Sequence, residues 1–249
     1  MKILRAAMIT GALLLPGMAS ADFISFAAGA GIWQETPSGT FRKTGDPTDV
    51  SLENDLFWGQ ETQNYFFATL EHPVPLLPNI RLMKTGMNHG GSGTLTRTIV
   101  INGQTYNVSE NVTSDASIDQ LDMTLYWELL DNVVSLDLGL NAKQVKLDYT
   151  VTGSTSGTTS DTFDEIIPMI YGMVGASPIP DLLLSAEMSY VTYSGSTVSD
   201  FTAKVSYTTA FFVGFEAGYR SQHFQFDDVA GTNANIDFKG PFAGVYVKF

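Results

Sequence analysis

The chain has 249 residues, no cysteine, and 13 basic against 26 acidic side chains, a net charge of −13. Without cysteine there are no disulfides, thiolate metal sites or cysteine nucleophiles, and a strongly acidic chain offers no basic face for nucleic acid. The three histidines lie far apart, so we expect no metal and no cofactor. Few charges (16%) and many aromatics (12%) are typical of a barrel whose outside faces lipid.

Residues 1–21 have the pattern of a secretory signal peptide. Lys2 and Arg5 form a positive start, Ala6–Leu15 is apolar, and Ala19–Ala21 is a small-residue cleavage site. The apolar run is shorter than the ~20 residues that a membrane-spanning helix needs. We therefore expect export, cleavage before Asp22, and a mature chain of residues 22–249.

The rest of the chain alternates apolar and polar residues with a period of two, which indicates β-strands. In the segment 121–129, Leu, Met, Leu, Trp and Leu share one face, while Asp, Thr, Tyr and Glu share the other. Ten strands are predicted, near residues 23–34, 63–72, 79–101, 104–130, 133–151, 162–176, 181–193, 200–208, 210–226 and 234–249. Eight strands are the alternative, if the seventh and eighth are irregular.

The predicted connections alternate between short and long. The short ones are 73–79, 131–132, 177–181 and 208–210; the long ones are 34–63, a region around 102–103, 152–162, 194–200 and 227–235. Short turns on one rim and long loops on the other are the pattern of an outer-membrane barrel, whereas a soluble β-sandwich has no reason to separate them. We predict one domain: an all-β, antiparallel, up-and-down transmembrane β-barrel in a bacterial outer membrane.

Within this barrel, residues 93–117 are predicted to form a polar hairpin that stands above the outer surface. Its turn would be Asn102-Gly103, a strong signal for a type I′ hairpin.

Three segments carry a resemblance to a known family: Glu71–Asn79, Leu130–Leu140 and the ending Gly240–Phe249. They resemble the OMP_w_GlyGly family of proteobacterial outer-membrane β-barrels over the whole mature length. The resemblance implies location and fold, and it brings no substrate or catalytic residues. The terminal Phe249, on one face with Val247 and Val245, also resembles the signal that such barrels present to their assembly machinery.

Charged and polar side chains on the polar strand faces are candidates for a network in the lumen. They are Arg81, Asp122, Glu128, Asp137, Asn141, Lys143, Glu187, Lys204, Glu216, Arg220 and Lys248. A ten-stranded barrel is little wider inside than its own side chains, so these charges must pair. Lys204 is expected to meet Glu216, and Asp137 to meet Glu128 or Asp122 through a cation or Lys143. The network either fills the barrel or lines a narrow conduit.

These features predict a small, non-enzymatic outer-membrane protein with a narrow-pore or envelope-structural role. A closed barrel that presents the 93–117 hairpin for surface interaction is the alternative. A less favoured one is a hydrolase at the rim, in which His223 acts with Asp227 and Asp228 and His89 rises toward the same rim. Expected partners are outer-membrane lipids, lipopolysaccharide and the barrel assembly machinery, with the protein itself a monomer.

Overall fold

The computed structural model describes residues 24–74 and 76–249. The predicted signal peptide and its cleavage before Asp22 lie outside the described residues. Within them, no helix is long and apolar enough to span a membrane.

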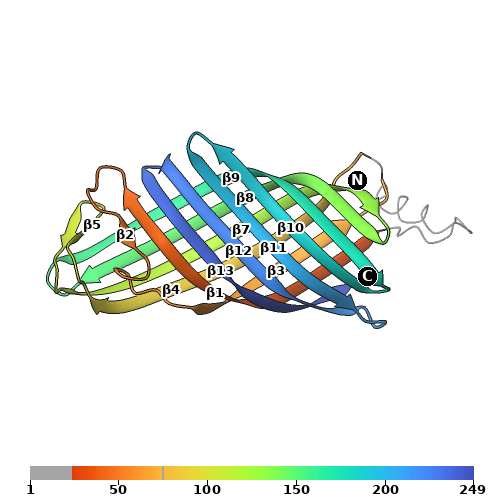
Figure 1. Ribbon diagram of the computed structural model, residues 1–249, viewed down its shortest axis with the longest axis horizontal. Coiled ribbons are helices and arrows are strands. Elements are labelled where there is room, and N and C mark those ends of the chain that lie inside the picture. The colour runs from red at the N-terminus through yellow and green to blue at the C-terminus, as the bar shows by residue number, and fades with distance from the viewer. Residues whose placement is uncertain (1–23, 75) are drawn as a thin grey trace, which may run out of the picture.

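Ten long strands form a closed antiparallel ring (Figure 1). They are β1 (Ser25–Lys43), β3 (Glu61–Glu71), β4 (Asn79–Thr94), β7 (Asn111–Asp131), β8 (Val134–Gly153), β9 (Gly157–Ile179), β10 (Leu182–Tyr193), β11 (Ser196–Thr208), β12 (Val213–Val229) and β13 (Thr232–Lys248). Each pairs with its neighbours in chain order, and β13 pairs with β1 to close the ring. The predicted ten-stranded β-barrel is confirmed, and the count of eight is wrong.

Three short strands lie beside this ring. The strand β2 (Val50–Ser51) pairs with β1, while β5 (Ile99–Ile101) and β6 (Gln104–Tyr106) form a separate hairpin. All three lie at the end of the barrel away from the chain termini (Figure 1).

Alternation along the strands separates an outward from an inward set of side chains, as the period of two predicts. Every strand of the ring exposes large apolar side chains on its outward face, which together form what we call the apolar band. One from each strand, in chain order, is Ile32, Phe66, Leu82, Leu121, Leu140, Ile170, Met188, Phe201, Phe215 and Val245.

Farther from the termini the outward side chains become polar, as at Asp115, Ser117 and Asp119 on β7. We call this part of the barrel the distal half. The ring therefore has an apolar outside near the termini and a polar outside beyond.

Several strands are longer than predicted, because pairing continues through polar segments. The strand β1 reaches Lys43, opposite Thr232 of β13, so the predicted loop 34–63 begins only after residue 43. The predicted loops 152–162, 194–200 and 227–235 are instead strand pairs closed by tight turns near 154–156, 194–195 and 230–231. Segments rich in Ser and Thr indicate loops in the sequence. In this barrel, however, such segments continue the strands and pair with their neighbours.

The predicted turn at Asn102-Gly103 is confirmed: Ile101 lies opposite Gln104, and both turn residues have positive φ, 50° and 78°. These are the angles that favour Asn and Gly in a type I′ turn.

The predicted polar projection, however, is wrong. Ile99, Ile101 and Tyr106 of this hairpin are buried and pack against Val50 and Leu52 of the segment between β1 and β3. That segment folds over the mouth of the barrel and needs an apolar cover, which the hairpin supplies.

Candidate functional site

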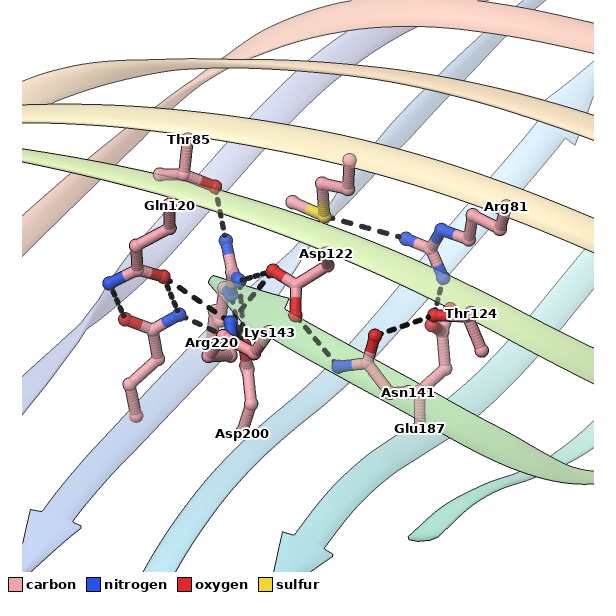
Figure 2. A network of polar contacts seen from close by, with 12 residues as sticks. Arg81, Thr85, Gln120, Asp122, Thr124, Asn141, Lys143, Glu187, Asp200 and Arg220 are labelled. Carbon is pink, nitrogen blue, oxygen red and sulfur yellow. Dashed lines mark hydrogen bonds and ion pairs between the residues drawn. The ribbon is translucent and has the colours of Figure 1, made fainter. Parts of the chain in front are cut away.

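Buried ion pairs lie in the lumen of the barrel, and Figure 2 shows those around Asp122, Lys143, Asp200 and Arg220. We call this group the central cluster. Its charged members are Arg81, Asp122, Lys143, Glu187, Asp200, Lys204, Glu216 and Arg220. Four cations thus face four carboxylates, and the cluster has no net formal charge.

Lys143 of β8 is at the centre of one part of the cluster and is fully buried. Its Nζ lies 2.7 Å from Oδ2 of Asp122 and 3.0 Å from Oδ2 of Asp200. Arg220 of β12 holds the same Asp200 with two parallel hydrogen bonds, of 3.0 Å from Nε and 2.6 Å from Nη2. The Arg220 guanidinium also lies 5.1 Å from the ring centroid of Trp33. A carboxylate that accepts two hydrogen bonds from a guanidinium and also pairs with an ammonium is strongly fixed in place.

The other part of the cluster is organised around Glu187 of β10. Its carboxylate pairs with Arg81 of β4 and lies 2.8 Å from Nζ of Lys204. Lys204 continues to Glu216 at 3.5 Å, and the hydroxyl of Tyr65 donates to Glu216 at 2.7 Å. Because each buried charge has an opposite partner, this arrangement avoids the large cost of an isolated charge.

Seven of the eleven predicted network residues meet in this cluster: Arg81, Asp122, Lys143, Glu187, Lys204, Glu216 and Arg220. The predicted pair of Lys204 with Glu216 is confirmed. Asn141, also predicted to face inward, donates to Asp122 at 2.7 Å. Lys248 lies instead near the terminal rim, with Nζ 3.6 Å from Oε2 of Glu71.

The other two, Glu128 and Asp137, lie opposite each other near the terminal rim and outside the central cluster. Asp137 thus lies opposite Glu128, one of its two predicted neighbours. The prediction that Lys143 bridges them is wrong, because Lys143 lies directly opposite Asp122 and pairs with it. The register of two strands decides this, and the register is not visible in the strand pattern.

Asp200 is the central residue that sequence reasoning missed. It lies at the junction of the predicted loop 194–200 and the predicted strand 200–208, whereas β11 begins already at Ser196. The signal was present, since Asp200, Thr202 and Lys204 share one face by the period of two.

A pair of glutamines closes the central cluster toward the distal half. Gln120 and Gln222 exchange hydrogen bonds of 3.0 Å and 2.8 Å across the lumen. Nζ of Lys143 donates to Gln120 at 3.3 Å. These two uncharged residues, also missed, form the boundary between the cluster and the space above it.

An apolar cavity of about 80 Å³ begins at Gln120 and extends into the distal half. Aromatic and aliphatic side chains make up most of its wall. Among them are Phe41, Leu52, Leu56, Trp58, Ile118, Val145, Leu147, Phe163, Phe224, Phe226, Ile236 and Phe238. Leu52, Leu56 and Trp58 belong to the segment between β1 and β3, so this segment forms part of the cavity wall.

Two buried titratable groups lie beside this cavity, above the last apolar-band residues of β1 and β4. Nε2 of His89 is 3.2 Å from Oε1 of Glu35, and both side chains are fully buried. The contact is not an aligned hydrogen bond, since neither ring nitrogen of His89 has a hydrogen-bond partner among the described residues. The ring stacks instead on Trp58 and Phe238, at centroid distances of 4.9 Å and 5.7 Å.

Burial makes both groups prefer their neutral forms. It raises the pKa of Glu35 to about 7, although the hydrogen bond from Gln63 acts in the opposite direction. It lowers the pKa of His89 to about 4. Between about pH 4 and pH 7 the pair is therefore a neutral acid beside a neutral imidazole.

The predicted hydrolase site at the rim, in which His223 acts with Asp227 and Asp228, is not assembled as expected. Nδ1 of His223 lies 3.0 Å from Oδ1 of Asp237. Asp228 instead accepts a hydrogen bond from the hydroxyl of Thr44 at 2.6 Å, and the backbone N–H of Asp227 donates to Ser196.

His89 does not rise to this rim, since it is enclosed in the lumen. The register does place Ser199 of β11 directly opposite His223, on the other side of β12 from Asp237.

Acidic residues in the distal half accept hydrogen bonds that hold neighbouring segments together. Asp46 accepts the backbone N–H groups of Asn102 and Gly103, at 2.7 Å and 2.9 Å. Glu110 accepts the hydroxyl of Ser156 and the N–H of Thr155, contacts that lower the pKa of its carboxyl to about 2. No group of three potential metal ligands occurs within residues 24–74 and 76–249.

The closed ring and its filled centre define a small antiparallel β-barrel with a blocked lumen. No protein-family model and no curated protein match the chain, so the resemblance to the OMP_w_GlyGly family stays a prediction.

Among solved structures, the chain is similar to the outer membrane protease OmpT from Escherichia coli, at 12% identity over 90% of this chain and 97% of that chain, with a TM-score of 0.49. It is also similar to the translocator domain of the autotransporter NalP from Neisseria meningitidis, at 10% identity over 100% and 95%, with a TM-score of 0.46. A third is Ail, the attachment invasion locus protein of Yersinia pestis, at 7% identity over 91% and 99%, with a TM-score of 0.36. Identities this low concern the fold alone.

Proposed function

We propose that this is a non-enzymatic β-barrel of a bacterial outer membrane that binds a small apolar molecule in the distal half of its lumen. The observation that carries the proposal is the apolar cavity above the paired glutamines. The distal half would face the outside of the cell, because an even number of strands keeps both termini at the periplasmic rim.

The membrane assignment is supported by closure and by the apolar band. In the closed ring every strand pairs with two neighbours at the level of the apolar band, which is the condition for a sheet in hydrocarbon. Side chains such as Ile170 and Leu140 are 63% and 59% exposed, and a continuous belt of this kind would be a liability in water. Export by the predicted signal peptide is consistent with both features.

The expected partners follow from the same surface. The apolar band would contact lipid chains, and the outward polar residues of the distal half would face lipopolysaccharide. The terminal Phe249 exchanges backbone hydrogen bonds with Phe26, at 2.8 Å and 2.9 Å, so the last residue belongs to the closing strand pair. Recognition of this strand by the assembly machinery is part of the proposal.

The central cluster favours binding over a narrow pore. The spaces beside its ion pairs measure only about 40 Å³ and 20 Å³. A conduit for ions would require these pairs to separate, and separated buried charges are costly. In a planar bilayer we therefore expect no discrete conductance steps from the refolded protein.

The mostly apolar lining of the cavity favours an apolar ligand, and its small volume favours a slender one. Small-molecule sites are mostly apolar, with a few polar groups at fixed places. Here the polar residues of the wall are Lys43, Gln120, Tyr149, Thr162 and Thr232. An apolar cavity of ~150 Å³ holds benzene, so a space of about 80 Å³ suits the end of a slender alkyl chain rather than a ring.

Trp58 in the cavity wall allows a direct test with 1-bromobutane, whose bromine quenches indole fluorescence on contact. In detergent, we expect saturable quenching of the wild-type protein and loss of that component in Trp58→Phe. Trp127, on the outside at 39% exposure, is the matched control: Trp127→Phe should keep the saturable component. Quenching that never saturates, or that survives in Trp58→Phe, would contradict binding in this cavity.

An ester hydrolase at the membrane surface is the second candidate, favoured by the row Ser199, His223 and Asp237 across β11, β12 and β13. Asp237 would orient the imidazole, whose Nε2 would accept the proton of the serine hydroxyl. A fluorophosphonate probe tests it. Labelling that disappears in Ser199→Ala and persists in Ser221→Ala would support the candidate, and an unlabelled wild-type protein would exclude it.

A further inference from the structure

The ladder between β9 and β10 stops before either strand ends. The last paired residues are Ile170 and Tyr190, although β9 extends back to Gly157 and β10 forward to Tyr193. Pro168 lies two residues beyond the last pair on β9. Proline has no N–H to donate, and within sheets it is confined to edges and bulges.

Beyond this point β9 lies beside the β10–β11 hairpin without pairing to it. We call this region the seam. It consists of residues 163–169 of β9, 191–193 of β10 and 196–198 of β11, together with Phe226 of β12. The neighbouring ladders show that the interruption is local, because β8 pairs with β9 up to Gly157 and β11 pairs with β12 up to Gln225.

The seam begins at the edge of the apolar band. Ile170 and Ile166, on the outward face of β9, are 63% and 66% exposed, and Pro168 lies between them. Asp164, the next outward residue, is polar and bonded to Gln144. In the proposed membrane the seam would therefore open where hydrocarbon gives way to the headgroups.

The cavity reaches this seam from the inside. Its wall includes Phe163 of β9 and Phe224 and Phe226 of β12, but no residue of β10 or β11, the two strands that lie between them in the sheet. The rings of Phe163 and Phe226 stack with centroids 5.4 Å apart and planes at 23°. Two aromatic rings thus close the wall where the hairpin is too short to do so.

Most of the remaining side chains in the seam are apolar as well. Met169 and Val198 are buried, and Ile167 and Val191 pack against the same group. Glu165 faces inward between Phe163 and Ile167 and is partly exposed. Opening this wall would require rotation of side chains and movement of the hairpin, with no ladder hydrogen bond between β9 and β10 to break.

We propose that the seam is a lateral passage through which an apolar molecule moves between the cavity and the hydrocarbon of the bilayer. Phe163 and Phe226 are its gate. The inference rests on the proposed binding in the cavity and adds a route: an apolar molecule leaves through the wall, since the central cluster blocks the lumen. The passage spares the ligand any contact with the buried charges.

The test locks the seam with a disulfide in a chain that has no cysteine of its own. Continuing the register by one step places Met169 opposite Val191, so the variant is Met169→Cys with Val191→Cys. The control pair is Val174→Cys with Ala186→Cys, which are directly paired lower in the same ladder. Both variants carry Trp127→Phe, which removes the lipid-exposed indole.

Access from the bilayer is measured in vesicles that contain 1-bromododecane, which stays in the lipid because it is almost insoluble in water. We expect it to quench Trp58 in the reduced seam variant, to lose this quenching on oxidation, and to regain it on reduction. The oxidised control pair should still be quenched. A Trp58→Phe version of each protein supplies the background.

The outcomes separate the route from the binding. If oxidised and reduced seam variants are quenched alike by 1-bromododecane, the lateral passage is wrong while saturable 1-bromobutane quenching in detergent still supports the cavity. If 1-bromobutane fails as well, the binding proposal fails with it. Should the disulfide not form, Phe163→Ala gives the second measurement: removal of the gate ring must speed quenching from the lipid, and an unchanged rate overturns the passage.

Discussion

The central cluster and the distal cavity are built from the same strands, yet their chemistry is opposite. Asp122 and Ile118 both point inward from β7, and Arg220 and Phe224 both point inward from β12. The outside of the barrel changes in the reverse sense, from apolar around the cluster to polar around the cavity. At each height along the barrel axis, therefore, one of the two surfaces, the inner or the outer, is apolar and the other is polar.

The reversal has a simple physical reason. Within the proposed membrane, lipid covers the apolar outer face, so the lumen can be polar if its groups are paired. Beyond the membrane the same ring stands in water and needs a dehydrated interior, like any soluble antiparallel sheet. The difference teaches that the distal half has the side-chain pattern of a soluble β-sheet, whereas the half near the termini has the pattern of a membrane barrel.

The largest effect is expected from Lys143→Met in the central cluster. This change leaves Asp122 and Asp200 buried around Arg220 alone, and removing one partner of a buried ion pair costs about 3–5 kcal/mol. The free energy of unfolding, measured by urea titration in lipid vesicles, should fall by that amount. Lys84→Met is the control: Lys84 is 59% exposed and pairs with Asp119 at the surface, where a pair contributes about 0–1 kcal/mol. Equal effects of the two variants would show that the cluster is solvated.

A smaller and more local effect is expected from Leu56→Ala in the distal half. Leu56 is 1% exposed and packs in the apolar core there, so its truncation costs about 3 kcal/mol. If the distal half behaves as a separate soluble unit, the segment 44–60 becomes accessible to protease, while the barrel still resists SDS until it is heated. Leu77→Ala, at a 57% exposed position, is the control. Loss of SDS resistance in Leu56→Ala would instead mean that the two halves unfold together.

The smallest effect is a change in pH dependence in Glu35→Gln. Folding raises the pKa of Glu35 from 4.5 to about 7, so its contribution to stability is lost as the pH rises through this range. Folding lowers the pKa of His89 from 6.5 to about 4, so its contribution is lost as the pH falls through that range. The two slopes oppose each other in the wild-type protein. In the Glu35→Gln variant only the histidine slope remains, and stability should fall by about 2 kcal/mol between pH 6.5 and pH 4.

Urea titrations of Glu35→Gln and the wild-type protein at pH 4.5, 5.5 and 6.5 check this expectation, with Asp131→Asn, an exposed acid at the end of β7, as the control. Parallel curves for all three proteins would mean that Glu35 is charged and hydrated in the folded state.

The period of two in the amino-acid sequence, together with the composition and the spacing of the connections, was enough to obtain the barrel class, the ten strands and the inward position of seven cluster residues. This succeeds because a residue's face depends only on its place within its own strand. The same local logic found the turn at Asn102-Gly103, which needs positive φ at two neighbouring residues.

Only the tertiary structure decided which inward charges meet. Lys143 lies opposite Asp122 rather than near Asp137, and Asp200 joins the cluster because β11 begins earlier than its polar sequence indicates. The burial of Ile99 and Tyr106, the cavity and the seam have the same origin. Each depends on register, strand length and the packing of segments far apart in the chain, and these are set by the closure of the ring rather than by any single strand.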